Sequence, residues 1–324
     1  MSKSIYVDKA NVYALAVASI VFVLSMIVSP FYIYGDQEFY RLVYDVIPNL
    51  NFGDAFYFYQ RTLSSNEVIH FSLVYFLGGV MSKEVMMSAL NFLLAFASFR
   101  LLVNLGAYKS IALLIVLTNF YLWILYMHAE RLKVACILMF FAWVVFDKRF
   151  RFIVLSALGL LAHVSTIIIF SSTLLIYARD ELKQFFTGLR LNKVFFIALP
   201  LMAGAVVISI AQLYDKFLAY TDDADMMTGG QALRMLIFFG MSLLYAKKKS
   251  DVVIVYAFLM SMVILFSGDR VNMFGYLVFL FFSVHYRGGF NVGVLLTSLY
   301  FMTTTFGMVE RIIEYGNAFH GLHD

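Results

Sequence analysis

The chain has 324 residues, of which 62% are hydrophobic and only 14% are charged, and its mean hydropathy is +0.85. A soluble domain carries about 25% charged residues, so this composition excludes an ordinary soluble enzyme and predicts a chain that folds in lipid. The net charge of +4 comes without a basic tract interleaved with aromatic residues, which argues against nucleic acid as a partner. One cysteine, Cys136, excludes an internal disulfide and a cysteine-based metal site.

Apolar runs long enough to cross about 30 Å of hydrocarbon recur along the chain. The first, 10–29, ends at Pro30 and is too long for the apolar core of a signal peptide, so we expect a retained membrane helix. Further spans are expected at 85–103, 111–127, 132–146, 152–177, 194–213, 232–246, 252–266, 271–286 and 292–309. The shorter run 68–81 is expected to enter the membrane and return. The pattern predicts an all-α, polytopic integral membrane domain over 1–324, with about ten to twelve transmembrane or re-entrant helices.

Two polar segments, 31–67 and 214–231, are expected to be loops at the outer face. The first mixes acidic residues with many Tyr and Phe, whose rings favour the headgroup level of a bilayer. The second contains Asp222, Asp223 and Asp225, whose spacing is only weak evidence for a divalent cation site. We therefore expect no metal site and no other cofactor.

Lys and Arg in short loops mark the cytoplasmic side of a membrane protein. The basic clusters lie at Lys3 and Lys9, at Arg100 and Lys109, at 148–151, at 179–193, at 247–249 and at Arg287. All can lie inside if 68–81 returns to the outer side and 152–177 is a pair of short helices that turns near His163. A single tilted helix over 152–177 is the alternative, and it would place 247–249 outside. The first threading gathers most acidic residues at the outer face.

The strongest functional pattern is a run of ionisable residues between two apolar spans: His128, Glu130, Arg131 and Lys133. An Arg at the centre of a bilayer costs about 2.5–3.5 kcal/mol on insertion scales. A guanidinium can hold phosphate by two parallel hydrogen bonds, and a His or a carboxylate can move a proton. This mixture predicts a catalytic site. The alternative is an interfacial helix start at which the helix dipole favours Glu130.

Further candidate residues are expected at the same outer face of the membrane. Arg270, beside Asp269, begins a span and would complete a phosphate clamp; the alternative is a self-compensating ion pair in a loop. His163 is either a base or donor at the site or a hydrogen-bonded structural residue. The candidate catalytic residues are His163, His128, Glu130, Arg131 and Arg270, and the candidate substrate-binding residues are Asp36, Tyr40, Arg41, Lys133, Arg234 and Asp269.

The order of these motifs resembles that of the EpsG/Wzy-type family of polytopic polysaccharide polymerases. The resemblance rests on Gly35-Asp36 with Tyr40, on the run 130–135, on Ala-His-Val-Ser at 162–165 and on Asp-Arg-Val at 269–271. It covers residues 31–280. This chain departs from the family pattern at Leu132, where Gln is usual, and at Ala162, where an aromatic residue is common.

The resemblance implies a GT-C-like glycosyltransferase that joins undecaprenyl-diphosphate-linked oligosaccharide repeat units into O-antigen, capsule or exopolysaccharide. It implies the periplasmic face of a bacterial inner membrane, and a chain-length regulator membrane protein as a partner. Fixed cations of the protein would stabilise the negative charge of the leaving diphosphate, so that no metal is needed. His163, His128 or Glu130 would serve as the base. Two alternatives stay open: a flippase, which should carry charge through the depth of many helices, and an O-antigen ligase or acyltransferase with the same outer-face site.

Overall fold

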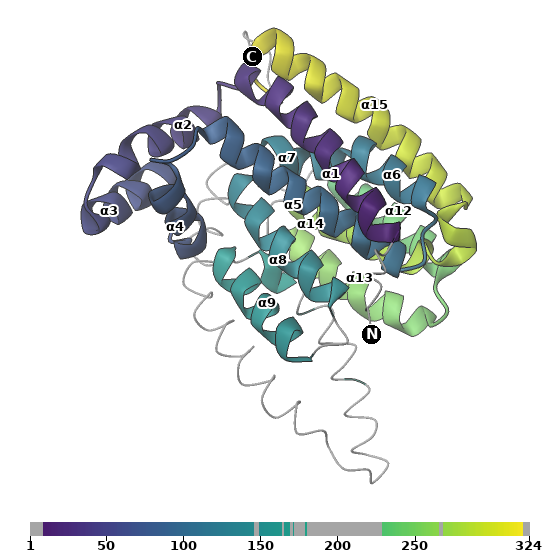
Figure 1. The fold of residues 1–324 in the computed structure, drawn as a ribbon. Helices are drawn as coiled ribbons and strands as arrows, with labels where there is room; N and C mark the ends of the chain where they lie inside the picture. Colours follow the sequence, from purple (N-terminus) through teal and green to yellow (C-terminus); the bar gives the residue numbers. More distant parts are fainter. Residues whose placement is uncertain are drawn as a thin grey trace, which may run out of the picture. The chain divides into compact units, whose positions relative to one another are not determined.

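A computed structural model describes residues 9–145, 149–163, 165–168, 171, 179, 229–265 and 268–319 (Figure 1). Every regular element within these ranges is a helix, which confirms the all-α class. Among the described residues, three helices are long and apolar enough to cross a membrane: Lys9–Phe31, Lys83–Asn104 and Tyr286–Tyr315. A bent pair makes a fourth if it counts as one span. These helices agree with a membrane protein, and the larger predicted helix count stays a prediction.

The chain divides into two compact units. Unit 1 comprises Met1–His163 and Arg287–Asp324, and unit 2 comprises Val164–Tyr286. The expected single domain over 1–324 stays a prediction. The candidate residues are therefore assigned to their own units, with most of them in unit 1.

Unit 1 is built on long helices that alternate in direction. Its helices are α1 (Lys9–Val28), α2 (Asp36–Val46), α3 (Phe52–Leu63), α4 (Val68–Leu77), α5 (Lys83–Asn104), α6 (Lys109–Thr118), α7 (Phe120–Met127), α8 (Glu130–Val144), α9 (Arg149–Ala162) and α15 (Val292–Tyr315). Helix α1 packs on α5. Helix α5 packs on α8, and α8 packs on α9. Helices α2, α3 and α4 form a small lobe beside the ends of α1 and α5 (Figure 1), around the buried side chains of Tyr59, Phe71 and Val74.

The segment 31–67 is mostly helical, so the loop expected there is wrong in its secondary structure, while its place at the outer face stays a prediction. Tyr40, Val43, Tyr44 and Ile47 are all buried, and their i, i+3, i+4, i+7 spacing is that of one helix face. Gly35 precedes α2 with a φ of +69°, a conformation that glycine adopts without strain. The abundance of charged residues concealed this amphipathic pattern, because Glu38, Arg41 and Asp45 occupy the other face of α2.

The expected uninterrupted span 111–127 is also corrected by the structure. Helices α6 and α7 meet at Asn119 with a bend of 52°. The Asn119 side chain accepts a hydrogen bond from the backbone N–H of Leu122 at 3.1 Å and so caps α7. The carbonyl of Thr118, at the break, accepts one from the Thr305 hydroxyl of α15 at 2.9 Å. A broken helix is tolerated in lipid where the protein satisfies the freed backbone groups in this way.

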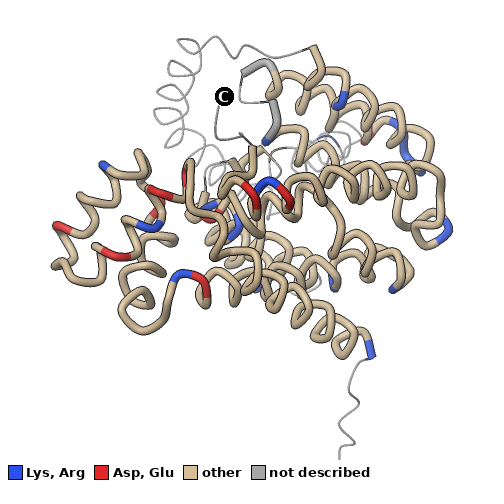
Figure 2. Tube along the Cα trace, turned by 90° about the horizontal axis from the view of Figure 1, so that it is seen from above, with Lys and Arg blue, Asp and Glu red and all other residues tan. Residues whose placement is uncertain are grey.

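The described acidic residues of unit 1 gather at one end, whereas its Lys and Arg residues lie at both ends (Figure 2). We call the end where α1, α7, α9 and α15 finish and where α5 and α8 begin the α2 end. The described acidic residues of unit 1 all lie there: Asp36, Glu38, Asp45, Asp54, Glu67, Glu84, Glu130, Glu310 and Glu314. Lys9, Arg100, Lys109, Arg151 and Arg287 lie towards the opposite end. The α2 end also carries basic residues: Arg41, Arg61, Lys83, Arg131, Lys133 and Arg311. Because the positive-inside rule counts Lys and Arg rather than net charge, the assignment of the α2 end to the outer face stays a prediction.

The expected break at His163 is confirmed, because α9 ends at Ala162 and the next helical residues are 166–168. The second helix expected within 152–177, the span 194–213 and most of the loop 214–231 lie outside the described residues.

Unit 2 contains α12 (Gly229–Tyr245), α13 (Lys249–Leu265) and α14 (Gly268–Ser283). The Tyr256 hydroxyl of α13 donates to the carbonyl of Gly275 in α14 at 2.7 Å and ties these two helices together.

Candidate functional site

The break between α7 and α8 organises the candidate site. The last carbonyls of a helix have no partner within that helix and need one from elsewhere. Here the carbonyl of Tyr126 accepts from Asn91 Nδ2 at 3.0 Å and from Lys133 Nζ at 2.8 Å, and the carbonyl of Met127 accepts from Gln37 Nε2 at 3.3 Å. Side chains from α2, α5 and α8 therefore fix the end of α7.

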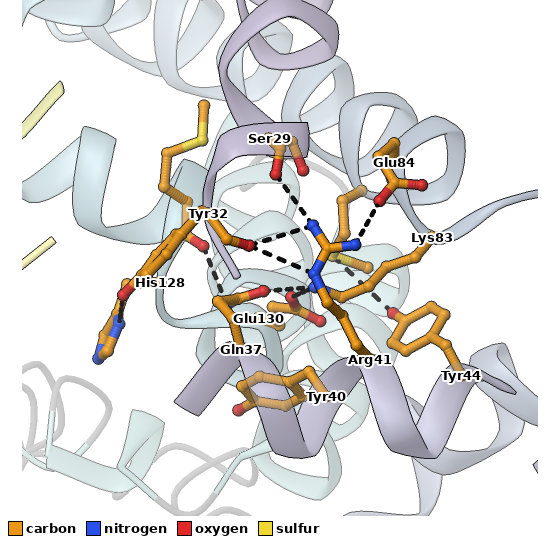
Figure 3. Close-up of polar contacts among 12 residues, drawn as sticks. Ser29, Tyr32, Gln37, Tyr40, Arg41, Tyr44, Lys83, Glu84, His128 and Glu130 are labelled. Atoms are coloured by element: carbon orange, nitrogen blue, oxygen red, sulfur yellow. Dashed lines mark hydrogen bonds and ion pairs between the residues drawn. The ribbon is translucent and has the colours of Figure 1, made fainter. Parts of the chain in front are cut away.

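An enclosed ion pair lies directly behind this break (Figure 3). Lys83 Nζ at the start of α5 is 2.9 Å from Glu130 Oε1 at the start of α8, and the two side chains are 7% and 1% exposed. Lys83 also donates to the side-chain carbonyl of Gln37. Lys133 is fully buried. Glu130 and Lys133, expected to meet the substrate, are thus enclosed, and neither can reach a ligand unless α7 and α8 rearrange.

Arg131 lies beside this pair but faces a more open region. Its Nε donates to the Tyr40 hydroxyl at 3.0 Å and lies 3.2 Å from Glu67 Oε2, and its Nη1 donates to the carbonyl of Leu63 at 3.4 Å. The Arg131 side chain is 20% exposed. Burial raises the pKa of the Tyr40 phenol above its usual value, so its hydroxyl stays neutral while it accepts from Arg131.

Glu67 joins Arg131 to His163. Its other oxygen, Oε1, lies 3.4 Å from His163 Nε2. The Ser65 hydroxyl donates to Glu67 Oε2 at 2.8 Å, which fixes the carboxylate at the N-terminus of α4. The structure therefore brings together Tyr40, Arg131 and His163, three residues selected from the sequence, through a carboxylate that the sequence analysis did not select.

His128 forms a second, more exposed group with Asp36 and Tyr32. Its Nδ1 is hydrogen-bonded to the Tyr32 hydroxyl at 2.6 Å, and its Nε2 is 3.6 Å from Asp36 Oδ2. The ring of Phe319 packs edge-on against the imidazole, with centroids 4.8 Å apart. The side chains of His128 and Asp36 are 26% and 64% exposed, so this pair is accessible from the α2 end.

Helix α2 presents both groups to the same break. Asp36 and Tyr40 are one turn apart on α2 and contact His128 and Arg131, respectively, which are three positions apart across the α7–α8 break. The i, i+4 spacing places the two α2 side chains on one helix face. His128 and Arg131 thus share a partner helix and not a helix of their own, because His128 lies outside α8.

Arg41 is held by acceptors within the protein (Figure 3). Its Nη1 is 2.9 Å from Glu84 Oε1, and its Nη2 donates to the carbonyls of Ser29 at 3.2 Å and Tyr32 at 3.1 Å. These bonds tie the turn after α1 to α2 and α5. The substrate-binding role expected for Arg41 does not follow from this geometry, which assigns its guanidinium to the scaffold.

His70 also escaped the sequence analysis, because it lies within the apolar run 68–81. Its Nδ1 is hydrogen-bonded to the Tyr59 hydroxyl at 3.0 Å, and the ring is fully buried among Tyr40, Tyr44 and Tyr59. Burial lowers its pKa well below the usual value, so the imidazole is neutral. No spacing pattern marks Glu67, Lys83, Gln37 or His70, because their partners are distant in the sequence.

The remaining candidates belong to unit 2. Arg234 is on α12, Asp269 and Arg270 are in the first turn of α14, and the side chains of Arg234 and Arg270 are exposed. A clamp that combines either arginine with Arg131 stays a prediction. Within the described ranges, no group of three or more His, Cys, Asp or Glu side chains is arranged to hold a metal ion; Asp222, Asp223 and Asp225 lie outside those ranges.

No family model, curated protein or solved structure matches this chain. The class of protein is therefore defined by the fold and the site alone. Within the described ranges it is an all-helical protein with three or four helices able to cross a membrane. At the α2 end of unit 1, a partly exposed arginine lies beside a carboxylate, a histidine and a neutral phenol.

Proposed function

We propose that the chain is a membrane-embedded glycosyltransferase of GT-C-like architecture that polymerises undecaprenyl-diphosphate-linked oligosaccharide repeat units. The product would be O-antigen, capsule or exopolysaccharide, made at the periplasmic face of a bacterial inner membrane. The observation that carries the proposal is Arg131, whose side chain is 20% exposed and whose guanidinium is oriented by Tyr40 and Glu67 at the α2 end of unit 1. An arginine in such a position is suited to bind a phosphate anion.

The leaving diphosphate is the first chemical requirement of this reaction. As the bond between the anomeric carbon and the phosphate oxygen breaks, its electron pair goes to that oxygen, and negative charge develops there. A cation that is already oriented stabilises this charge without reorganising at the moment of reaction. Arg131 meets the requirement, because its Nε is fixed by two partners.

The acceptor sugar is the second requirement, since its hydroxyl loses a proton as its oxygen bonds to the anomeric carbon. The candidate bases are His163, His128 and Glu130. Glu130 is enclosed and paired with Lys83, and His163 is 4% exposed beside Glu67. The exposed His128–Asp36 pair fits the role best, because a base has to come within hydrogen-bond reach of the proton that it takes.

The two alternatives differ in what they need from the chain. A flippase would need cations distributed through the depth of the membrane, whereas the charges described in unit 1 gather at its ends. A ligase or an acyltransferase would use the same site with another acceptor. Transfer at one face is therefore the reaction class that the charge distribution favours.

The polysaccharide of a strain that lacks this chain separates these alternatives. A polymerase deletion should leave single repeat units attached to their final acceptor, seen as one short band in place of a ladder. Complementation with the full chain should restore the ladder. Loss of all decoration, including the single-unit band, would contradict a polymerase and support a ligase or a flippase.

A further inference from the structure

The carboxylate of Glu67 makes an unusual pair of contacts at the candidate site. One oxygen lies 3.2 Å from Arg131 Nε, and the other lies 3.4 Å from His163 Nε2. Glu67 and His163 are 11% and 4% exposed, so water competes little for these contacts. One acidic side chain thus fixes a guanidinium and an imidazole that belong to two different helix ends.

Glu67 is itself held in place. It is the N-cap residue of α4, and the Ser65 hydroxyl donates to Oε2 at 2.8 Å. The backbone N–H of Glu67 donates in turn to the same hydroxyl at 3.3 Å. The carboxylate is therefore preorganised by its own loop and does not depend on Arg131 for its position.

The edge of Arg131 that Glu67 occupies is also informative. Glu67 and Tyr40 both contact Nε, and Leu63 accepts from Nη1 at 3.4 Å, near the limit for a hydrogen bond. No described residue accepts from Nη2. Glu67 thus contacts the guanidinium from one side, while the Nη edge retains the geometry that binds two oxygens of an anion.

We propose that Glu67 is a positioning residue for anion binding at Arg131, and that it orients Arg131 and His163 together at the expense of anion affinity. This inference rests on the proposed function. The physical reason for the trade is that a fixed negative charge orients the guanidinium but repels the incoming diphosphate. Glu67 therefore favours turnover over tight binding, as expected when ground-state binding alone does not raise kcat.

Purified full-length Glu67→Gln protein should turn over more slowly but bind its substrate more tightly. Turnover should fall about ten- to a hundredfold, because the amide keeps the size of the side chain but loses its charge-assisted contacts. The KM for lipid-diphosphate-linked oligosaccharide should also fall, by severalfold. Binding of inorganic diphosphate, followed by the thermal midpoint of the protein in detergent, should become tighter. A carboxylate that serves only folding would lower the amount of active protein and leave KM unchanged.

Glu84→Gln is the matched control, because it removes another partly buried Arg–carboxylate contact, the 2.9 Å pair with Arg41. It should leave both KM and diphosphate binding unchanged. If Glu67→Gln gives the same unchanged KM, or weaker diphosphate binding, the inference is overturned and the proposed function stands. If diphosphate has no effect on wild-type protein and Arg131→Gln behaves like wild type, the proposed function itself fails.

Discussion

Lys83 Nζ lies 2.9 Å from Glu130 Oε1, and both side chains are nearly closed off from solvent. The pair joins the first turn of α5 to the first turn of α8, next to the carbonyls that end α7. It follows that the helix break presenting His128 and Arg131 is held by a charge pair behind it. Removing one partner of a buried pair costs about 3–5 kcal/mol, because the other charge is left uncompensated.

A double-mutant cycle tests this support. Lys83→Met and Glu130→Gln should each lower the thermal midpoint of the protein in detergent strongly. The double variant should lose clearly less than the sum of the two, because neither Lys83 nor Glu130 then remains without the other. Additive losses would show that Lys83 and Glu130 contribute independently and that the pair does not hold the break.

Tyr40→Phe tests the orientation of Arg131 without changing any formal charge. The variant loses the hydroxyl that accepts from Arg131 Nε at 3.0 Å. A hydrogen bond to a charged group contributes about 1.5–3 kcal/mol, but Glu67 still holds the same nitrogen, so we expect roughly a tenfold fall in turnover. Burial raises the pKa of the Tyr40 phenol, so wild-type protein should show no loss of activity from ionisation of this phenol near pH 10, where an ordinary phenol ionises.

Tyr44→Phe, one turn further along α2, is the matched control. Tyr44 is as buried as Tyr40, but its hydroxyl faces Met87 Sδ at 3.9 Å and Glu130, and it is not among the partners of Arg131. It should therefore retain activity close to wild type. An equal loss of turnover in both variants would show that α2 responds to any lost hydroxyl, and Arg131 would have no special dependence on Tyr40.

The topology is open to a labelling test. With Cys136 replaced, single cysteines at Ser250 and Asn192 should resist an impermeant thiol reagent in intact cells, because basic clusters stay inside. Cysteines at Asn66, which is exposed at the α2 end, and at Asp223 should react. Labelling at Ser250 from outside would overturn the threading and the assignment of the α2 end to the outer face.

The sequence predicted the helical class and a site at residues 128–131, because apolar runs and an isolated group of charges are local signals. It also predicted the break at His163. It failed on 31–67, where charged residues on one face of α2 concealed the buried face formed by Tyr40, Val43, Tyr44 and Ile47. Glu67 and Lys83 escaped notice because their partners, Arg131 and Glu130, lie 64 and 47 positions further along the chain (131 − 67 and 130 − 83). Pairing over such distances is set by helix packing, which local patterns do not encode.

The reaction should proceed without a divalent metal, because Arg131 supplies fixed positive charge where the diphosphate leaves. Purified protein treated with a chelator should keep its activity on lipid-linked substrate. The control is the same protein with magnesium or manganese added back, which should change little. Activity that disappears with chelator and returns with either ion would contradict this mechanism and direct attention to the acidic segment around Asp222, Asp223 and Asp225.

The central claim is that Arg131 binds diphosphate through its planar fork, and Arg131→Lys tests it most directly. Lysine keeps the positive charge but lacks the paired geometry of the guanidinium. The measurement is polymer length at equal protein level in the membrane, with the variant expected to insert normally. We predict that most polymer is lost, in line with a fall of roughly ten- to a hundredfold in rate for a lost charge-assisted contact. A full-length ladder from Arg131→Lys would contradict the account and reduce Arg131 to an interfacial cation at a helix start.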